Sequence, residues 1–226
     1  MTVLKPIRLV LLGAPGSGKG TLTSRLLKNV PQLSAISTGD LLRNEIAKKS
    51  EIGSVASGYI KKGQLLPDKF MAELVSSELG NRQWLNNKAS FLLDGFPRTI
   101  NQATELDKSL QTHDANINLV VELNVPPEVI LQRISNRWVH QPSGRVYNLQ
   151  YSPPKVPFKD DVTGEPLIQR PDDNPETFKV RLDGYFKQLE PLKEFYQKKG
   201  VFDVVSGETS DIVFPKLLEV VEKKFS

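Results

Sequence analysis

The residues best suited to chemistry lie near the start of the chain, in the segment GAPGSGKGT at positions 13–21. Gly13, Gly18 and Lys19 have the spacing of a P-loop, in which successive backbone N–H groups surround a phosphate at a helix N-terminus. The positive charge of Lys19 would stabilise a phosphoryl group while it is transferred. An ordinary glycine-rich turn is the alternative, but an apolar segment before the loop and a helical pattern after it favour the P-loop.

Gly20 departs from the common P-loop pattern, which has Ser or Thr directly after the lysine. That hydroxyl normally binds the magnesium ion of a nucleotide, and Thr21 stands one residue too late for this role. We therefore expect magnesium to be held mainly by nucleotide oxygens and water, which this strongly hydrated ion tolerates.

Arginines are the next group that could act on phosphates, because their planar guanidinium groups donate to two oxygens at once. Each could equally be a solvated surface charge. Arg133 and Arg137 are four residues apart, so we expect them to project from one face of one helix. The candidates come from different segments of the chain and are Arg43, Arg98, Arg133, Arg137, Arg170 and Arg181.

The elements that must position these residues alternate between short apolar strands and helices. Apolar runs at 7–12, 91–94, 118–125 and 201–205 each precede a helical pattern, and 176–199 forms a further helix. This alternation predicts an α/β fold with a parallel sheet and helices on both faces. Open sheets of this kind bind ligands at the carboxyl ends of their strands, which is where Asp94 and Arg98 should lie.

Two segments interrupt the alternation. Residues 37–66 are helical without a strong strand, and residues 138–175 are rich in Pro, Gly and Asp with short alternating pieces such as RVYNLQY. We interpret the whole chain, 1–226, as one core domain that carries a helical insert at 37–66 and a small β-rich insert at 138–175.

Composition excludes several classes of protein. The chain has 226 residues, a formal charge of +4, 25% charged residues and no apolar run near the length of a membrane span. The lysines are mixed with acidic residues, which favours nucleotides over nucleic acid as partners. No cysteine is present, so disulfides and thiolate-bound zinc are excluded. The first strand is expected within a few residues of Met1, which leaves no room for a cleaved leader.

Catalysis through a phosphohistidine is also disfavoured. The only histidines are His113, expected in a surface loop, and His140.

Three segments together resemble the adenylate kinase family: the variant loop GAPGSGKGT, then STGDLLR at 37–43, then LLDGFPRT at 92–99. The stretch HQPSGRVYNLQYSPPKVPFKDDVTGEPL and the RPDD after it extend the resemblance to the long-lid form of that family. A narrower resemblance, carried by INLVVELNV and VSGETSDIVFPKLL, is to fungal mitochondrial members that use GTP.

The resemblance implies a P-loop fold with a five-stranded parallel sheet, an insert that binds the nucleoside monophosphate, and a lid. It implies reversible, magnesium-dependent transfer from a nucleoside triphosphate, with GTP favoured, to AMP. The protein would be a monomer of the mitochondrial matrix that binds neither nucleic acid nor membranes. A cytoplasmic location, ATP as donor, a UMP/CMP kinase and a P-loop switch that hydrolyses slowly are the alternatives. The long lid argues against the UMP/CMP kinase, and arginines on two inserts argue against the switch.

The resemblance also implies roles for individual residues. Arg43 and Arg98 would hold the acceptor phosphate, Arg133 and Arg137 the donor, and Arg170 and Arg181 the transferred group. Asp94 would orient magnesium-bound water, with a turn or cap as its alternative, and Thr38 would contact the acceptor base unless it is only an N-cap. Asp172 and Asp173 would orient lid arginines, with solvated turn charges as their alternative. The remaining implied nucleotide contacts are Gly16, Ser17, Gly18, Lys19, Gly20, Thr21, Gln64, Leu65, Leu66, Gly95, Phe96, Pro97, Gln102, Val146, Tyr147 and Thr209.

Family members with a zinc-bound lid carry two pairs of ligands, each pair separated by two residues. Here the corresponding residues are His140 and Ser143, then Asp160 and Thr163. Hydroxyl groups are poor zinc ligands, so we expect no zinc and a hydrogen-bond network in its place. Four unrelated polar turn residues are the alternative.

Overall fold

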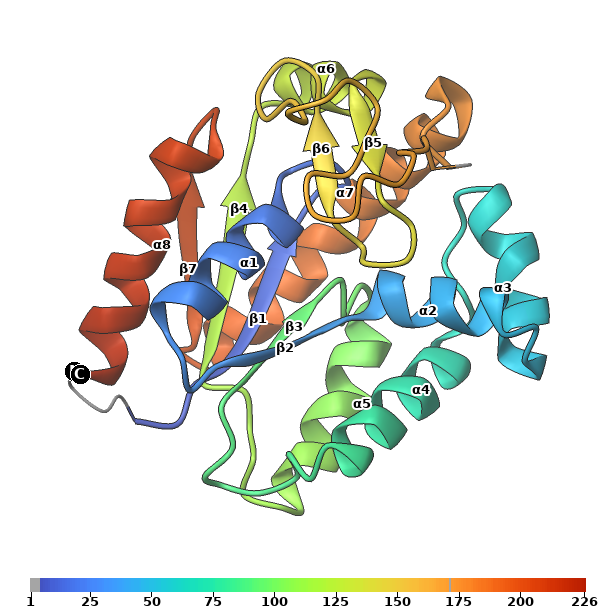
Figure 1. Ribbon diagram of the computed structural model, residues 1–226. Helices are drawn as coiled ribbons and strands as arrows, with labels where there is room; N and C mark the ends of the chain where they lie inside the picture. Colours follow the sequence, from blue (N-terminus) through green and yellow to red (C-terminus); the bar gives the residue numbers. More distant parts are fainter. Residues whose placement is uncertain (1–4, 171) are drawn as a thin grey trace.

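The computed structural model describes residues 5–170 and 172–226 (Figure 1). Along the chain the elements are β1 (Arg8–Gly13), α1 (Lys19–Asn29), β2 (Ser34–Ser37), α2 (Thr38–Ala47), α3 (Glu51–Lys61), α4 (Asp68–Asn81), β3 (Phe91–Asp94), α5 (Ile100–Gln111), β4 (Leu119–Asn124), α6 (Pro127–Ser135), β5 (Arg137–Val139), β6 (Val146–Asn148), α7 (Pro175–Lys198), β7 (Phe202–Ser206) and α8 (Ser210–Phe225).

The central sheet has five parallel strands in the order β2-β3-β1-β4-β7. The four apolar runs of the sequence form β1, β3, β4 and β7, which confirms the predicted class of fold. The strand β2 was not apparent, because two of its four residues are serines and only Ile36 is strongly apolar. It joins the sheet through its pairing with β3, a contact between segments far apart in the sequence.

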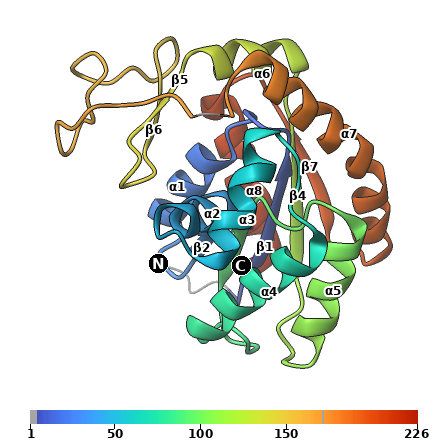
Figure 2. The same ribbon diagram turned by 90° about the vertical axis from the view of Figure 1, so that its right-hand side faces the viewer.

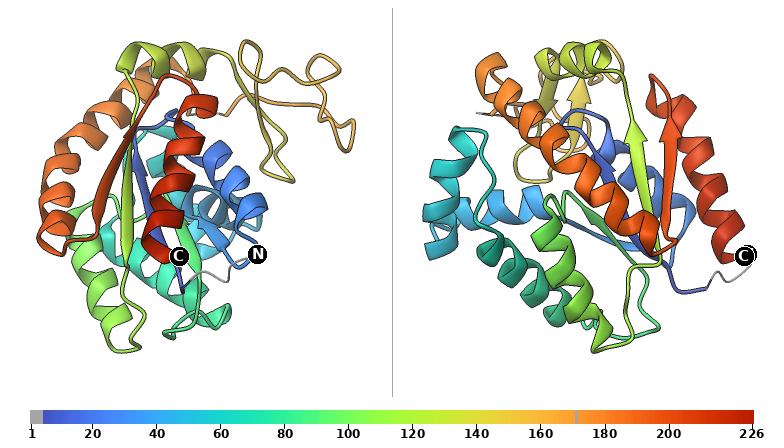
Figure 3. Two further views of the ribbon diagram at one scale, coloured as in Figure 1. Left: turned by 90° about the vertical axis from the view of Figure 1, so that its left-hand side faces the viewer. Right: turned by 180° about the vertical axis from the view of Figure 1, so that it is seen from behind.

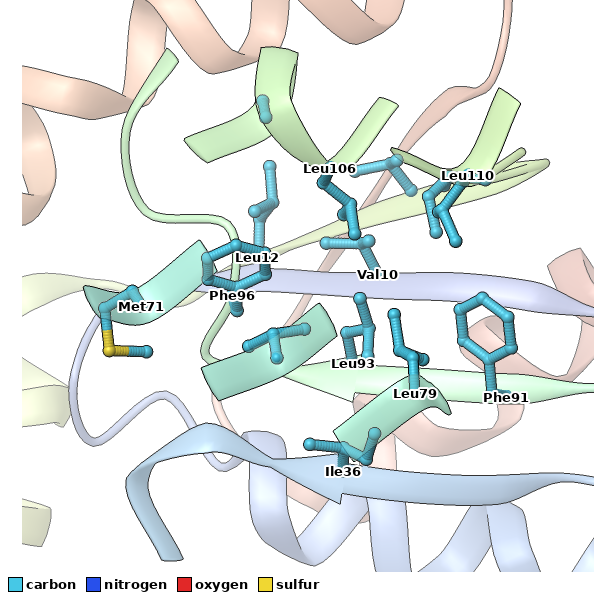
Figure 4. Packing of buried hydrophobic residues seen from close by; sticks show 14 of the residues in the cluster. Val10, Leu12, Ile36, Met71, Leu79, Phe91, Leu93, Phe96, Leu106 and Leu110 are labelled. Atoms are coloured by element: carbon cyan, nitrogen blue, oxygen red, sulfur yellow. The ribbon is translucent and has the colours of Figure 1, made fainter. Parts of the chain in front are cut away.

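Alternation of side chains along the strands separates two cores. Leu9 and Leu11 point to one face, where they pack with buried residues of α1 and α8. Val10 and Leu12 point to the other face and pack with residues of α4, α5 and α7, as the close-up shows (Figure 4). Two further views show α8 on one side of the sheet and α5 and α7 on the other (Figure 3). Because both faces are covered, the strands are apolar on both sides.

Both inserts lie towards the carboxyl ends of the strands. The helices α2 and α3 occupy the segment that we predicted to be helical, and β5 and β6 project from the sheet with their loops (Figure 2). The second insert contains less β-structure than predicted: β5 and β6 have three residues each, and otherwise only isolated bridges such as Val139 with Ile168 occur. The domain boundaries 37–66 and 138–175 remain our proposal.

None of the helices within the described residues combines the length and apolar character that crossing a bilayer demands.

Candidate functional site

A cavity of about 1050 Å³ opens at the carboxyl ends of the strands, between the two inserts. The ends of β1, β2 and β3 meet there, because Ser37 and Leu11 both pair in register with Asp94. The six candidate arginines all line this cavity, together with Lys19. Most of the other predicted contacts line it too: Gly16, Gly18, Gly20, Thr21, Thr38, Gln64, Leu65, Leu66, Gly95, Pro97, Gln102, Val146, Tyr147 and Thr209.

The loop between β1 and α1 has the geometry that phosphate binding needs. Gly16 and Gly18 adopt positive φ angles of 82° and 93°, which residues with a side chain rarely adopt. Gly18 precedes α1 without a side-chain cap, so the first N–H groups of the helix remain available. Lys19 Nζ donates to the carbonyl oxygens of Gly13 at 2.7 Å and Ala14 at 3.0 Å. The ammonium group is therefore already held over the loop.

Gly20 lies opposite the carboxylate of Asp94. A Cβ atom at position 20 would stand 4.0 Å from Asp94 Oδ2, so the absent side chain leaves space beside this carboxylate. Burial raises the pKa of Asp94, while Lys19 and Arg98 act in the opposite direction. Asp94 ends β3 and caps no helix, because Thr99 is the N-cap of α5.

Thr38 is tied to the same strand end. Ser37, and not Thr38, is the N-cap of α2, so the N-cap alternative for Thr38 is wrong. The Thr38 hydroxyl donates instead to the backbone oxygen of Asp94 at 3.2 Å. This bond joins the start of the first insert to the end of β3.

Gln102 fixes the backbone of Arg98. Its side-chain oxygen accepts from the Arg98 N–H at 2.8 Å, and its amide nitrogen donates to Asp68 at 2.9 Å. Arg98 Nε in turn donates to the Gly95 carbonyl at 2.7 Å, which aims the guanidinium group across the turn. Asp68 was missed by the sequence analysis, since nothing local marks it as a partner of a residue 34 positions away.

Two of the candidate arginines pair with the aspartates Asp172 and Asp173. Arg137 makes a bidentate pair with Asp173, in which Nε donates at 2.8 Å. Arg181 Nη1 lies 2.7 Å from Asp172 Oδ2. The predicted common helix face of Arg133 and Arg137 is wrong, because α6 ends at Ser135 and Arg137 begins β5. The two arginines enter the cavity from different elements.

Arg133 lies at one end of the P-loop and contacts its backbone. Its guanidinium group donates to the backbone oxygens of Glu208 at 2.5 Å and Gly16 at 3.4 Å, and it lies 5.8 Å from the centre of the Tyr151 ring. It therefore connects the loop with the segment before α8 and with the lid.

Positive charge is in excess within the cavity. Ten Lys and Arg side chains but only four Asp side chains belong to its described lining. Burial, with neighbouring arginines, lowers the pKa of Lys19 to about 8, of Arg170 to about 9 and of Arg98 to about 10. Arg170 Nε is also buried, and it has no hydrogen-bond partner among residues 5–170 and 172–226. Such concentrated, desolvated cations favour a polyanionic ligand.

Two predicted contacts, Ser17 and Phe96, do not belong to the cavity lining. Phe96 is 1% exposed and packs in the hydrophobic cluster around Val10 and Leu93, so its ring belongs to the core. Ser17 is buried, and its Oγ has no hydrogen-bond partner within the described residues. Contacts between these side chains and a nucleotide are therefore not supported.

The predicted network in the lid is confirmed. His140 Nδ1 and Ser143 Oγ lie 2.7 Å apart, and Asp160 accepts from Thr163 Oγ1 at 3.0 Å. His140 and Asp160 are each 2% exposed and lie 3.8 Å apart. No three His, Cys, Asp or Glu side chains in residues 5–170 and 172–226 come together to hold a metal ion.

Three further residues that the sequence analysis did not assign to this network complete it. Arg145 donates to both oxygens of Asp160 at 2.7 and 2.6 Å, and Tyr147 donates to the same carboxylate at 2.8 Å. The hydrogen bonds from Arg145 hold the pKa of Asp160 well below its usual range. Glu165 lies 2.5 Å from His140 Nε2. Tyr147 thus uses its hydroxyl within the lid, which leaves only other parts of the residue for the predicted base contact.

Known proteins are similar in sequence to this chain over most of its length. The family model described as adenylate kinase matches residues 11–201. A mitochondrial GTP:AMP phosphotransferase of Saccharomyces cerevisiae is 61% identical over 223 residues, covering 99% of this chain and 95% of the relative. A protein of the same name from Drosophila melanogaster is 44% identical over 216 residues, covering 94% of each chain.

Proposed function

The chain belongs to the adenylate kinase family, and from that premise we propose that it transfers the terminal phosphoryl group of GTP to AMP, giving GDP and ADP. The names of the two relatives support this reaction. The observation that carries it is the excess of cationic side chains that line one large cavity, with the P-loop at one side and the first insert at the other. Two polyphosphate ends would meet there.

We assign the acceptor side to Arg43 and Arg98, which reach the cavity from α2 and from the turn after β3. Thr38, Gln64–Leu66 and Gln102 would surround the AMP base. Arg43 pairs with Asp40, in the first turn of α2, so an incoming phosphate would compete with that carboxylate for the guanidinium group. The bidentate arginine geometry would fix the attacking phosphate oxygen in line with the donor.

On the donor side, we assign phosphate binding to the N–H groups of the loop from Gly16 to Thr21, with Lys19, Arg133 and Arg137. Arg170 and Arg181 would contact the group in transfer. As the bond between the γ-phosphorus and its bridging oxygen breaks, an AMP phosphate oxygen forms the new bond. Negative charge on the leaving group and the migrating phosphoryl group would be neutralised by these preorganised cations.

The residues present fit a magnesium ion that binds with the nucleotide. The space beside Gly20 and the single carboxylate of Asp94 suit an ion that keeps several waters, with Asp94 orienting them. When bound, magnesium would offset the negative charge of the phosphates, and Asp94 would hold it through its waters.

We further propose that lid closure excludes water, so that AMP and not water accepts the phosphoryl group. Gly144, in the loop between β5 and β6, already lies near Asp40 of the first insert, since a Cβ there would be 3.8 Å from that carboxylate. We place the protein in mitochondria, following the names of its relatives. We further propose that it is a monomer of the matrix without nucleic-acid or membrane partners.

The test is to incubate the protein with magnesium, AMP and each of GTP, ATP, CTP and UTP, and to follow nucleoside diphosphates by chromatography. We expect GDP and ADP in equal amounts, dependent on AMP. A Lys19→Met variant is the negative control. Release of GDP and phosphate without AMP would contradict phosphoryl transfer to AMP, and more efficient use of ATP than of GTP would contradict the donor.

A further inference from the structure

A charged pair lies at the rim of the cavity, where none of the phosphate contacts uses it. Arg25, on α1, lies 2.6 Å from Asp211, in the first turn of α8, and its guanidinium group also donates to the Ser210 carbonyl at 3.3 Å. Arg25, Ser210 and Asp211, which we name the α8 rim, all line the same cavity as the P-loop. The Asp211 side chain is 82% exposed, so its carboxylate is open to a ligand.

The strand order places the α8 rim on the donor side. The P-loop follows β1 and the acceptor residues follow β2 and β3. Ser210 and Asp211 of the α8 rim follow β7, which lies on the opposite side of β1. The α8 rim also borders the P-loop directly, because a Cβ at Gly18 would stand 3.3 Å from Ser210 Oγ. A nucleotide whose phosphates occupy the P-loop can therefore extend its base to this rim and away from AMP.

The chemistry of the pair matches guanine. Guanine presents the acceptors O6 and N7 next to N1–H and N2–H₂, which are donors, and arginine is a common partner of O6 and N7. A carboxylate can accept from N1–H and N2–H₂ together. Adenine presents an acceptor at N1 and a donor at N6, so a carboxylate opposite N1 would be repelled and the arginine would face an amino group.

We propose that Asp211 and Arg25 read the base of the donor nucleotide and select guanine over adenine, Asp211 accepting from N1–H and N2–H₂ and Arg25 donating to O6. This inference rests on the proposed function, since it assigns residues to the choice of GTP. An exposed ion pair between two helices adds little to stability, so a purely structural role for this pair would be weak.

The experiment compares kcat/KM for GTP, ATP, ITP and XTP at saturating AMP in the wild type, in Asp211→Asn and in Glu219→Gln. Glu219 is an exposed carboxylate on the same helix outside the cavity lining, so its variant is the matched control. Loss of a charge-assisted pair of hydrogen bonds should lower kcat/KM for GTP in Asp211→Asn by about tenfold. The same change should raise kcat/KM for ATP, because the amide no longer repels adenine N1. XTP carries an oxygen in place of the 2-amino group, so the new amide should improve its use relative to GTP.

The outcomes separate this inference from the proposed function. A wild type that prefers ATP contradicts the proposed donor, whatever Asp211 does. A wild type that prefers GTP, with the same GTP to ATP ratio in Asp211→Asn, overturns the role of the α8 rim and leaves the reaction intact. An equal loss with all donors also overturns it. If the variant does not fold, the wild type is tested with ITP, which lacks the 2-amino group of GTP. Equal kcat/KM values for ITP and GTP would overturn the proposed contact.

Discussion

Lys19 offers the sharpest test of the site, because one substitution should change turnover and the pH dependence of stability in different ways. Its ammonium group lies partly buried over the P-loop and donates to two loop carbonyls. Lys19→Met keeps the length of the side chain but removes the charge. Loss of a preorganised charge at the transferring group should lower turnover by on the order of a hundredfold or more.

The stability effect follows from the pKa. Burial lowers the pKa of Lys19 from its ordinary 10.5 to about 8. Near pH 7 both the folded and the unfolded states carry the proton, and the folded state bears the full cost of the buried charge. Between pH 8 and 10.5 the unfolded state holds the extra proton, so rising pH favours folding. At about 1.4 kcal/mol per pKa unit, the free energy of unfolding should rise by roughly 3 kcal/mol over this pH range.

At pH 7, Lys19→Met removes this cost but leaves two loop carbonyls without a donor, a loss of about 1–3 kcal/mol. We therefore expect nearly equal free energies of unfolding for the two proteins at pH 7. At pH 10 the variant should be less stable than the wild type by roughly 3 kcal/mol, because it lacks the gain. Urea unfolding from pH 7 to pH 10 measures this, and a difference between the two proteins that does not change with pH would refute the reasoning. Wild-type turnover in the folded variant would refute the catalytic role.

Three further predictions test other parts of the molecule. Arg98→Lys should raise KM for AMP far more than KM for GTP, because an ammonium group cannot replace the bidentate guanidinium group; steady-state kinetics measures this, and equal effects would place Arg98 elsewhere. Gly53→Ala should destabilise the first insert, since its Cβ would fall under 3.0 Å from the Glu45 backbone. In Gly58→Ala, in the same helix, the new Cβ would have no neighbour within 4 Å, so this variant should stabilise the protein by about 1 kcal/mol. Thermal unfolding measures both effects, and similar effects of the two substitutions would argue against this packing. Asp160→Ala should make the lid more sensitive to protease, because the donors around this carboxylate lose their acceptor, and metal analysis of the wild type should find no stoichiometric zinc; unchanged protease resistance, or bound zinc, would contradict the network.

The sequence by itself determined the features that depend on neighbours along the chain. The P-loop was recognisable because Gly13, Gly18 and Lys19 lie within a few residues of each other, between a strand and a helix. Apolar runs marked four of the five central strands, since most residues in each of these strands are apolar. The spacing of His140 and Ser143, together with the family resemblance, predicted a polar network in the lid, although not all of its members.

Tertiary structure decided what depends on segments far apart in the sequence. The strand β2 exists through its pairing with β3, and its own residues carry little β propensity. The spacing of Arg133 and Arg137 suggested one helix face, but the chain leaves α6 between them. The pair of Arg25 and Asp211 joins residues on α1 and α8, and no local pattern could bring them together. Only the packing of these helices against one face of the sheet, driven by burial of apolar side chains, sets that distance.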